Sequence, residues 1–125
     1  MSGKRKVLLI DDDEAVISYL VMKLSKQYDV VSTTDSRLAV TMAKQERPDV
    51  ILCDIDMPHL SGGDVAAALT DDPETAFVPF VYLTALVTPE EARELAGHVG
   101  GRPGVAKRAP IAELVAVIDR VCDRR

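Results

Sequence analysis

Short apolar runs alternate with segments of helical periodicity along this chain, and the alternation restricts the fold more than any other feature of the sequence. Between the apolar runs, hydrophobic residues recur every three or four positions, as on one face of a helix. Such β–α repetition predicts an α/β fold: a parallel sheet with right-handed crossovers and helices on both faces. The predicted strands are residues 7–10, 28–33, 49–53, 77–83 and 105–106.

The predicted helices have recognisable residues at their ends. The first helix is expected from Glu14 to Gln27, with Asp13 as its cap. Proline at the first helical position and a capping box predict another helix from Thr88. The remaining helices are expected after Asp35 or Ser36 as the cap, over residues 64–69, and from Pro110, with apolar residues on one face as far as Val121.

Composition limits the kind of protein. A chain of 125 residues with 47% hydrophobic and 28% charged residues is expected to form one domain with an ordinary core. The net charge of −5 argues against a general nucleic-acid binder. No apolar run approaches the ~20 residues of a membrane span, so no membrane insertion is expected. Cys53 and Cys122 are interpreted as buried thiols in a reducing cytoplasm.

Polar side chains follow four of the predicted strands, at the point where each strand ends. The carboxyl ends of parallel strands meet at one edge of the sheet, where ligands of such folds bind. Carboxylates gathered there repel one another and cost stability unless a cation neutralises them. The pattern therefore predicts a magnesium site that takes phosphate onto an aspartate. The residues are Asp11 and Asp12 after the first strand, Asp54 and Asp56 at the third, Thr84 at the fourth and Lys107 after the fifth.

Taken together, these segments resemble a response-regulator receiver domain. The resemblance covers essentially the whole chain, in order and with suitable spacing. It implies one receiver domain over residues 1–125, with a flavodoxin-like, doubly wound fold: a five-stranded parallel sheet of order 2-1-3-4-5 flanked by five helices. The segments that carry it are Val-Leu-Leu-Ile-Asp-Asp-Asp (7–13), Asp-Val-Ile-Leu-Cys-Asp-Ile-Asp-Met-Pro (49–58) with Gly62, Val-Pro-Phe-Val-Tyr-Leu-Thr-Ala (78–85), and Lys107.

The resemblance implies a magnesium site built mainly from aspartates. Asp12 and Asp54 would each give a carboxylate oxygen, and Asp56 its backbone carbonyl oxygen. Asp11 would hold a metal-bound water. Oxygen ligands of this kind suit Mg²⁺, which keeps part of its water shell. Met57-Pro58 and Gly62 are interpreted as loop-shaping residues, and His59 as an exposed loop histidine.

The resemblance also implies the reaction and its partners. Asp54 would accept a phosphoryl group from a phosphohistidine of a sensor kinase or a histidine phosphotransfer protein. Lys107 would pair with one phosphate oxygen as a point charge, and Thr84 would donate its hydroxyl to another. The protein would be a cytoplasmic signalling switch with slow self-catalysed transfer and hydrolysis, not an enzyme in the usual sense. Its output partner is not specified by the sequence.

Two positions near Lys107 depart from the family pattern. Arg108 stands where the family usually has proline, commonly after a cis peptide bond. A cis bond before a non-proline residue costs about 2.5–4 kcal/mol, so the Lys107–Arg108 bond is predicted to be trans. Gly104 stands where the family often has an aromatic switch residue, which suggests output through backbone or helix rearrangement or through another face. This departure also weakens the expectation of a homodimer through the fourth and fifth helical faces.

Three further points stay open from the sequence. The side chain of Asp56 would either slow arrival of the phosphate or help orient a hydrolytic water. A degenerate receiver that binds partners without phosphorylation is one alternative function. A haloacid-dehalogenase-like phosphatase is another, because Asp54-Ile55-Asp56 resembles its Asp-x-Asp pair. The chain is either a stand-alone domain that acts by contact with a partner or part of a longer protein.

Overall fold

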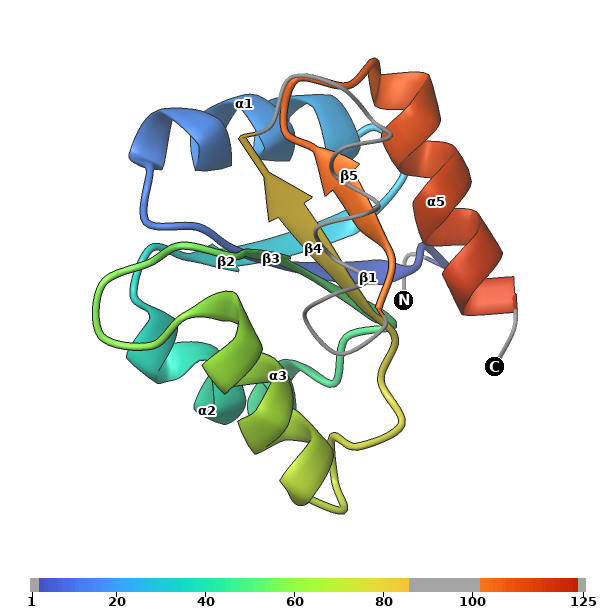
Figure 1. The fold of residues 1–125 in the computed structure, drawn as a ribbon. Helices are drawn as coiled ribbons and strands as arrows, with labels where there is room; N and C mark the ends of the chain where they lie inside the picture. The colour runs from blue at the N-terminus through green and yellow to red at the C-terminus, as the bar shows by residue number, and fades with distance from the viewer. Residues whose placement is uncertain (1–2, 86–101, 124–125) are drawn as a thin grey trace.

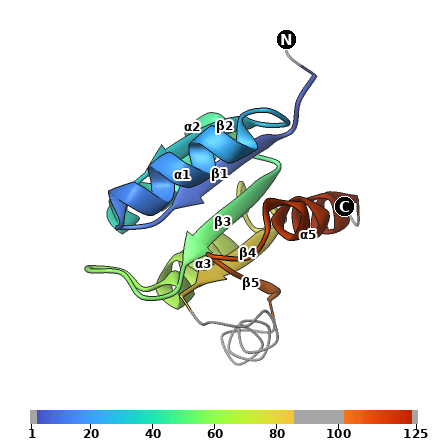
Figure 2. The same cartoon turned by 90° about the horizontal axis from the view of Figure 1, so that it is seen from above.

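Five parallel strands form the sheet in a computed structural model that describes residues 3–85 and 102–123. The strand order is β2-β1-β3-β4-β5, which confirms the predicted topology. Figure 2 shows the outer strands β2 and β5 at opposite ends of this order. The strands are β1 (Lys6–Ile10), β2 (Asp29–Thr33), β3 (Val50–Asp54), β4 (Phe80–Thr84) and β5 (Gly104–Ala106).

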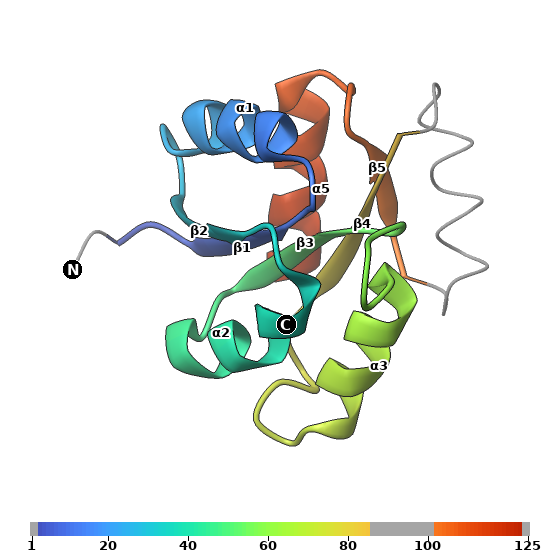
Figure 3. The same ribbon diagram turned by 90° about the vertical axis from the view of Figure 1, so that its left-hand side faces the viewer.

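Helices cover both faces of the sheet. In Figures 1 and 3, α1 and α5 lie on one side, and α2 and α3 on the other. The helix predicted from Thr88 lies outside the described residues. The described helices are α1 (Glu14–Leu24), η1 (Ser36–Leu38, a 3₁₀ turn), α2 (Ala39–Glu46), α3 (Gly62–Asp71) and α5 (Ile111–Asp123).

The alternation of side chains along β1 divides the core into two layers. Val7 and Leu9 pack with the cluster that includes α1 and α5, whereas Leu8 and Ile10 pack with the cluster that includes α2 and α3. All four are 0% exposed. The run is continuously apolar because both sets of alternating side chains are buried in a strand covered on both faces. Burying one such side chain contributes roughly 1.5–3 kcal/mol.

Some element boundaries differ from the sequence-based predictions. β4 begins at Phe80 rather than at residue 77, because Val78 donates its N–H to the carbonyl of Thr75 in a turn. Phe77 is 65% exposed, so its apolar character misled the prediction. α3 begins two residues before Asp64, because Ser61 and Asp64 form a reciprocal capping box.

Other details agree with expectation. Asp13 caps α1 by accepting from the N–H groups of Ala15 and Val16. Both cysteines are free and buried. No cis peptide bond occurs among the described residues, so Lys107–Arg108 is trans as predicted. Within residues 3–85 and 102–123, no helix has the length and apolar composition needed to cross a membrane.

Candidate functional site

The acidic pair after β1 divides into a buried and an exposed residue. Asp11 is 0% exposed, whereas Asp12 is exposed. The Oδ1 atom of Asp11 accepts from the N–H of Asp13 at 2.9 Å, which ties the carboxylate to the turn that starts α1. Its other oxygen, Oδ2, is left facing the rest of the site.

Asp54 ends β3 and is 6% exposed. The loop after it returns close to its own beginning, because the N–H of Gly62 donates to the carbonyl of Ile55 at 2.7 Å. A Cβ atom on Gly62 would collide with the carbonyl oxygen of Asp54 and lie 2.9 Å from the Cα of Ile55. Glycine is therefore required here for close approach, as its interpretation as a loop-shaping residue anticipated.

Lys107 joins the two buried carboxylates. Its Nζ atom lies 2.8 Å from Oδ2 of Asp11 and 3.2 Å from Oδ2 of Asp54. The backbone N–H of Lys107 donates to the carbonyl of Thr84 at 2.7 Å, which fixes the lysine beside the end of β4. Thr84 itself is 4% exposed and pairs with Ala106 across β4 and β5. The carboxyl ends of β1, β3 and β5 thus bring together the side chains of Asp11, Asp54 and Lys107.

The electrostatics of this group are unbalanced, because two buried carboxylates face one ammonium. Burial raises the pKa of Asp54 to about 6, and the charge of Asp11 adds to the rise while Lys107 opposes it. Burial alone would lower the pKa of Lys107, but the contacts with Asp11 and Asp54 outweigh burial and raise it. A further positive charge would therefore be favourable at this place.

The carboxylates of Asp11, Asp12 and Asp54 fit a divalent cation. Each offers an oxygen, and these oxygens lie within 4.8 Å of one another. The Oδ2 atom of Asp11 is buried, and the ammonium of Lys107 at 2.8 Å is its partner. Three carboxylates that face a single ammonium leave negative charge in excess, and an all-oxygen donor set is what a hard cation such as Mg²⁺ prefers.

Asp56 and His59 lie in the loop between β3 and α3. Both are exposed, and the Asp56 side chain is not part of the group formed by Asp11, Asp12 and Asp54. The expected role of the Asp56 carbonyl as a metal ligand stays a prediction. The exposed position of His59 agrees with its interpretation as a loop residue.

Sequence reasoning treated Ser36 only as a helix cap and missed its actual contacts. Asp35 provides the cap of η1, accepting from the N–H of Arg37. Ser36 instead turns inward, is 2% exposed, and bonds to the loop after β3. A buried serine contact between segments more than 20 residues apart has no local sequence signal.

Comparison with known proteins identifies relatives over most of the chain. The family described as response regulator receiver domain matches residues 7–119. The chain is 43% identical over 82 residues to the response regulator PleD of Caulobacter vibrioides, covering 65% of this chain and 18% of PleD. It is 35% identical over 80 residues to the protein PilH of Pseudomonas aeruginosa, covering 63% of this chain and 66% of PilH. The match thus spans less than two thirds of these relatives.

Solved structures agree with the fold. The chemotaxis protein CheY4 of Vibrio cholerae superposes with a TM-score of 0.81 at 28% identity, covering 95% of this chain and 99% of that chain. A response regulator from Desulfuromonas acetoxidans superposes with a TM-score of 0.80 at 27% identity, covering 95% and 97%.

Proposed function

The chain belongs to the response regulator receiver domain family, and from that premise we propose that Asp54 accepts a phosphoryl group from a phosphohistidine. The donor would be a sensor histidine kinase or a histidine phosphotransfer protein. The observation that carries the proposal is the position of Lys107, whose ammonium lies within 3.2 Å of Asp54 and 2.8 Å of Asp11. One partly exposed ammonium beside two buried carboxylates suits a site that receives both a cation and a dianionic group.

Asp12 and Asp54 would hold Mg²⁺ through carboxylate oxygens and Asp56 through its carbonyl, with Asp11 holding a metal-bound water. The cation would neutralise charge on the transferring phosphoryl oxygens, and phosphoryl transfer depends mainly on such positioning and neutralisation. The burial of Asp54 supports this role, because it keeps competing water away from the reacting oxygen.

The residues of the chain would divide the transfer step among them. A carboxylate oxygen of Asp54 attacks phosphorus while the bond from phosphorus to the imidazole nitrogen breaks, and the nitrogen keeps the electron pair. Lys107 pairs with one phosphoryl oxygen, for which its raised pKa keeps it charged. Thr84 donates its hydroxyl to another. Water later hydrolyses the aspartyl phosphate slowly, so the protein acts as a switch rather than as a turnover enzyme.

The alternatives have less support in the geometry. A haloacid-dehalogenase-like phosphatase needs the side chain of Asp56 as an acid beside Asp54, but this side chain is exposed and outside the carboxylate group. A degenerate receiver remains the second candidate because of Gly104 and Arg108. We place the switch in the cytoplasm, signalling through an output protein or domain by contact, without direct nucleic-acid binding.

Incubation with acetyl phosphate and Mg²⁺, followed by intact mass measurement, tests the proposal. We expect an adduct of one phosphoryl group on the wild-type chain and none on Asp54→Asn. A folded wild-type protein that binds Mg²⁺ but forms no adduct would favour the degenerate receiver. Repeated turnover of a phosphomonoester without a stable adduct would favour the phosphatase.

A further inference from the structure

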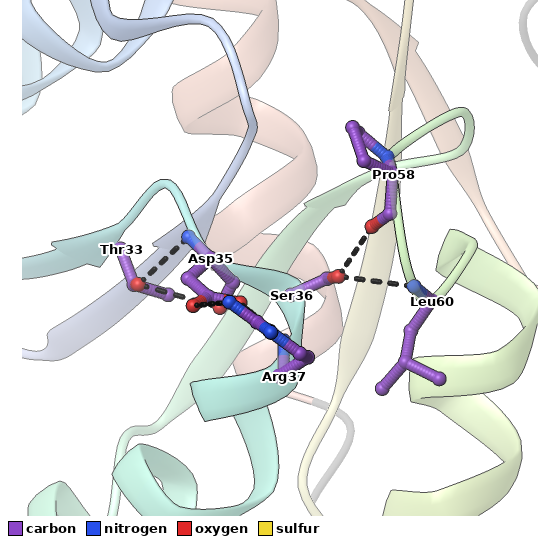
Figure 4. Close-up of polar contacts among 6 residues, drawn as sticks. All are labelled: Thr33, Asp35, Ser36, Arg37, Pro58 and Leu60. Atoms are coloured by element: carbon purple, nitrogen blue, oxygen red, sulfur yellow. Dashed lines mark hydrogen bonds and ion pairs between the residues drawn. The ribbon is translucent and has the colours of Figure 1, made fainter.

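The hydroxyl of Ser36 joins two loops that are far apart in the sequence. Ser36 opens η1, and only 2% of its surface is exposed. Its Oγ donates to the carbonyl of Pro58 at 2.8 Å and accepts from the N–H of Leu60 at 3.2 Å, as Figure 4 shows. Both partners lie between Asp54 and α3, so the hydroxyl holds this loop against the one that follows β2.

The two partners of Ser36 close a strained turn. His59 has a φ of 71°, a left-handed value that is uncommon for a residue with a Cβ atom. The N–H of Leu60 also donates to the carbonyl of Pro58 at 2.9 Å, so the hydrogen bond spans a single residue. This combination is the rarer, strained form of the γ-turn. Such strain persists only where the surroundings hold it, and Ser36 contacts both groups that close the turn.

Ser36 is itself held by its neighbours in the chain. The hydroxyl of Thr33 accepts from the N–H of Asp35 at 3.0 Å. The Asp35 carboxylate accepts from the backbone N–H of Arg37 at 3.0 Å and from its guanidinium at 3.0 Å and 2.9 Å. Figure 4 shows these contacts on both sides of Ser36 in the chain. Hydrogen bonds before and after Ser36 therefore hold the turn that directs its hydroxyl toward the loop after β3.

The loop that Ser36 holds is the one that carries the proposed metal ligand. The bond from Gly62 N–H to Ile55 closes the base of this loop, and Ser36 fixes its far end. Asp56 lies between these two constraints. We propose that Ser36 is a positioning residue for phosphoryl transfer to Asp54, holding the backbone of residues 55–58 where the Asp56 carbonyl can reach the cation. This inference rests on the proposed function.

The test compares Ser36→Ala and Ser36→Cys with the wild-type full chain. A thiol is larger than a hydroxyl and is only a weak donor and acceptor, so Ser36→Cys weakens the hydrogen bonds without leaving the cavity that Ser36→Ala leaves. In both variants we expect faster hydrogen exchange at the Leu60 amide and a higher dissociation constant for Mg²⁺, measured with the metal alone by amide chemical shifts. We expect acetyl phosphate to label Asp54 about 10-fold more slowly, as for a modest misplacement of reacting groups.

Thr75→Val is the matched control. Thr75 is also 2% exposed, and its hydroxyl donates to the carbonyl of Leu69 at 2.7 Å, away from the site. This variant should leave Mg²⁺ affinity and labelling rate within about twofold of wild type. Wild-type Mg²⁺ affinity and labelling in Ser36→Ala, or equal losses in Thr75→Val, would overturn the Ser36 proposal alone. A wild-type chain that takes no phosphoryl group would instead overturn the proposed function, and the Ser36 proposal with it.

Discussion

The backbone on the two sides of the acidic group formed by Asp11, Asp12 and Asp54 is held differently. The loop after β3 is fixed at its base by Gly62 and at its far end by Ser36, so several contacts determine the same backbone path. The β5 side consists of a three-residue strand that begins at Gly104, and Lys107 follows it directly. Several contacts thus fix the β3 side, whereas on the β5 side one lysine side chain reaches both buried carboxylates. Loss of that lysine should therefore have larger consequences than changes in the chain around it.

Replacement of Lys107 by alanine should have the largest effect on stability. The variant leaves Asp11 and Asp54 buried without a cation, and removing one partner of a buried ion pair typically costs about 3–5 kcal/mol. Urea denaturation of the metal-free protein measures the loss, and added Mg²⁺ should restore part of it.

Lys44→Ala is the control for Lys107→Ala. Lys44 also contacts two carboxylates, but its side chain is 42% exposed, so its loss should cost less than about 1 kcal/mol. Equal losses in the two variants would show that Lys107 has no special role in balancing the buried charges.

Asp54→Asn should stabilise the metal-free protein at pH 7.5. Because the pKa of Asp54 is raised to about 6, the folded state binds more protons than the unfolded state between roughly pH 4 and 6. Stability of the wild type therefore falls as the pH rises through this window, and the variant should lack that part of the decrease. A shift of this size corresponds to about 3 kcal/mol. Denaturation at several pH values without Mg²⁺ measures it, and a variant no more stable than wild type at pH 7.5 would contradict the charge imbalance.

Gly62→Ala tests the close approach at the base of the β3–α3 loop. The added methyl group would meet the backbone of Asp54 and Ile55, which cannot move as a side chain can. We expect a loss of about 1–3 kcal/mol together with slower labelling of Asp54. Gly63→Ala, one position further into α3, should instead be neutral or stabilising by up to about 1 kcal/mol. Similar behaviour of the two variants would remove the argument that this loop is tightly fixed.

Arg108→Ala should have the smallest effect. Arg108 is exposed, so we expect a change within about ±0.5 kcal/mol and an unchanged labelling rate. Thermal denaturation and intact mass measure the two quantities. A large loss of stability or of labelling rate would mean that the residues next to Lys107, and not only the Lys107 side chain, stabilise the β5 side.

The sequence predicted the sheet and the residues at its edge because both depend on local patterns. Each buried strand is a continuous apolar run, and a polar residue marks its end, so Asp11, Asp54 and Lys107 could be placed at one edge of a parallel sheet. The start of α3 was also encoded locally, in the Ser-x-x-Asp spacing of Ser61 and Asp64, but that signal was overlooked.

Other features depend on tertiary contacts and could not be predicted. Phe77 is as apolar as a strand residue, and only the turn at Val78 shows that it lies outside β4. The contact of Ser36 with Pro58 and the positive φ of His59 arise where two loops meet across the end of the sheet. Neither residue type nor spacing signals such a contact between loops, although the contact holds the loop next to Asp54.

The rate of phosphoryl adduct formation from acetyl phosphate, with Mg²⁺ and with a chelator, tests the central claim most directly. We predict one adduct per chain, located on Asp54 by peptide mass mapping, formed with Mg²⁺ and not with the chelator. An adduct that forms equally well without the cation, or that maps to another residue, would contradict the assignment of this acidic group as a metal-dependent phosphoacceptor site.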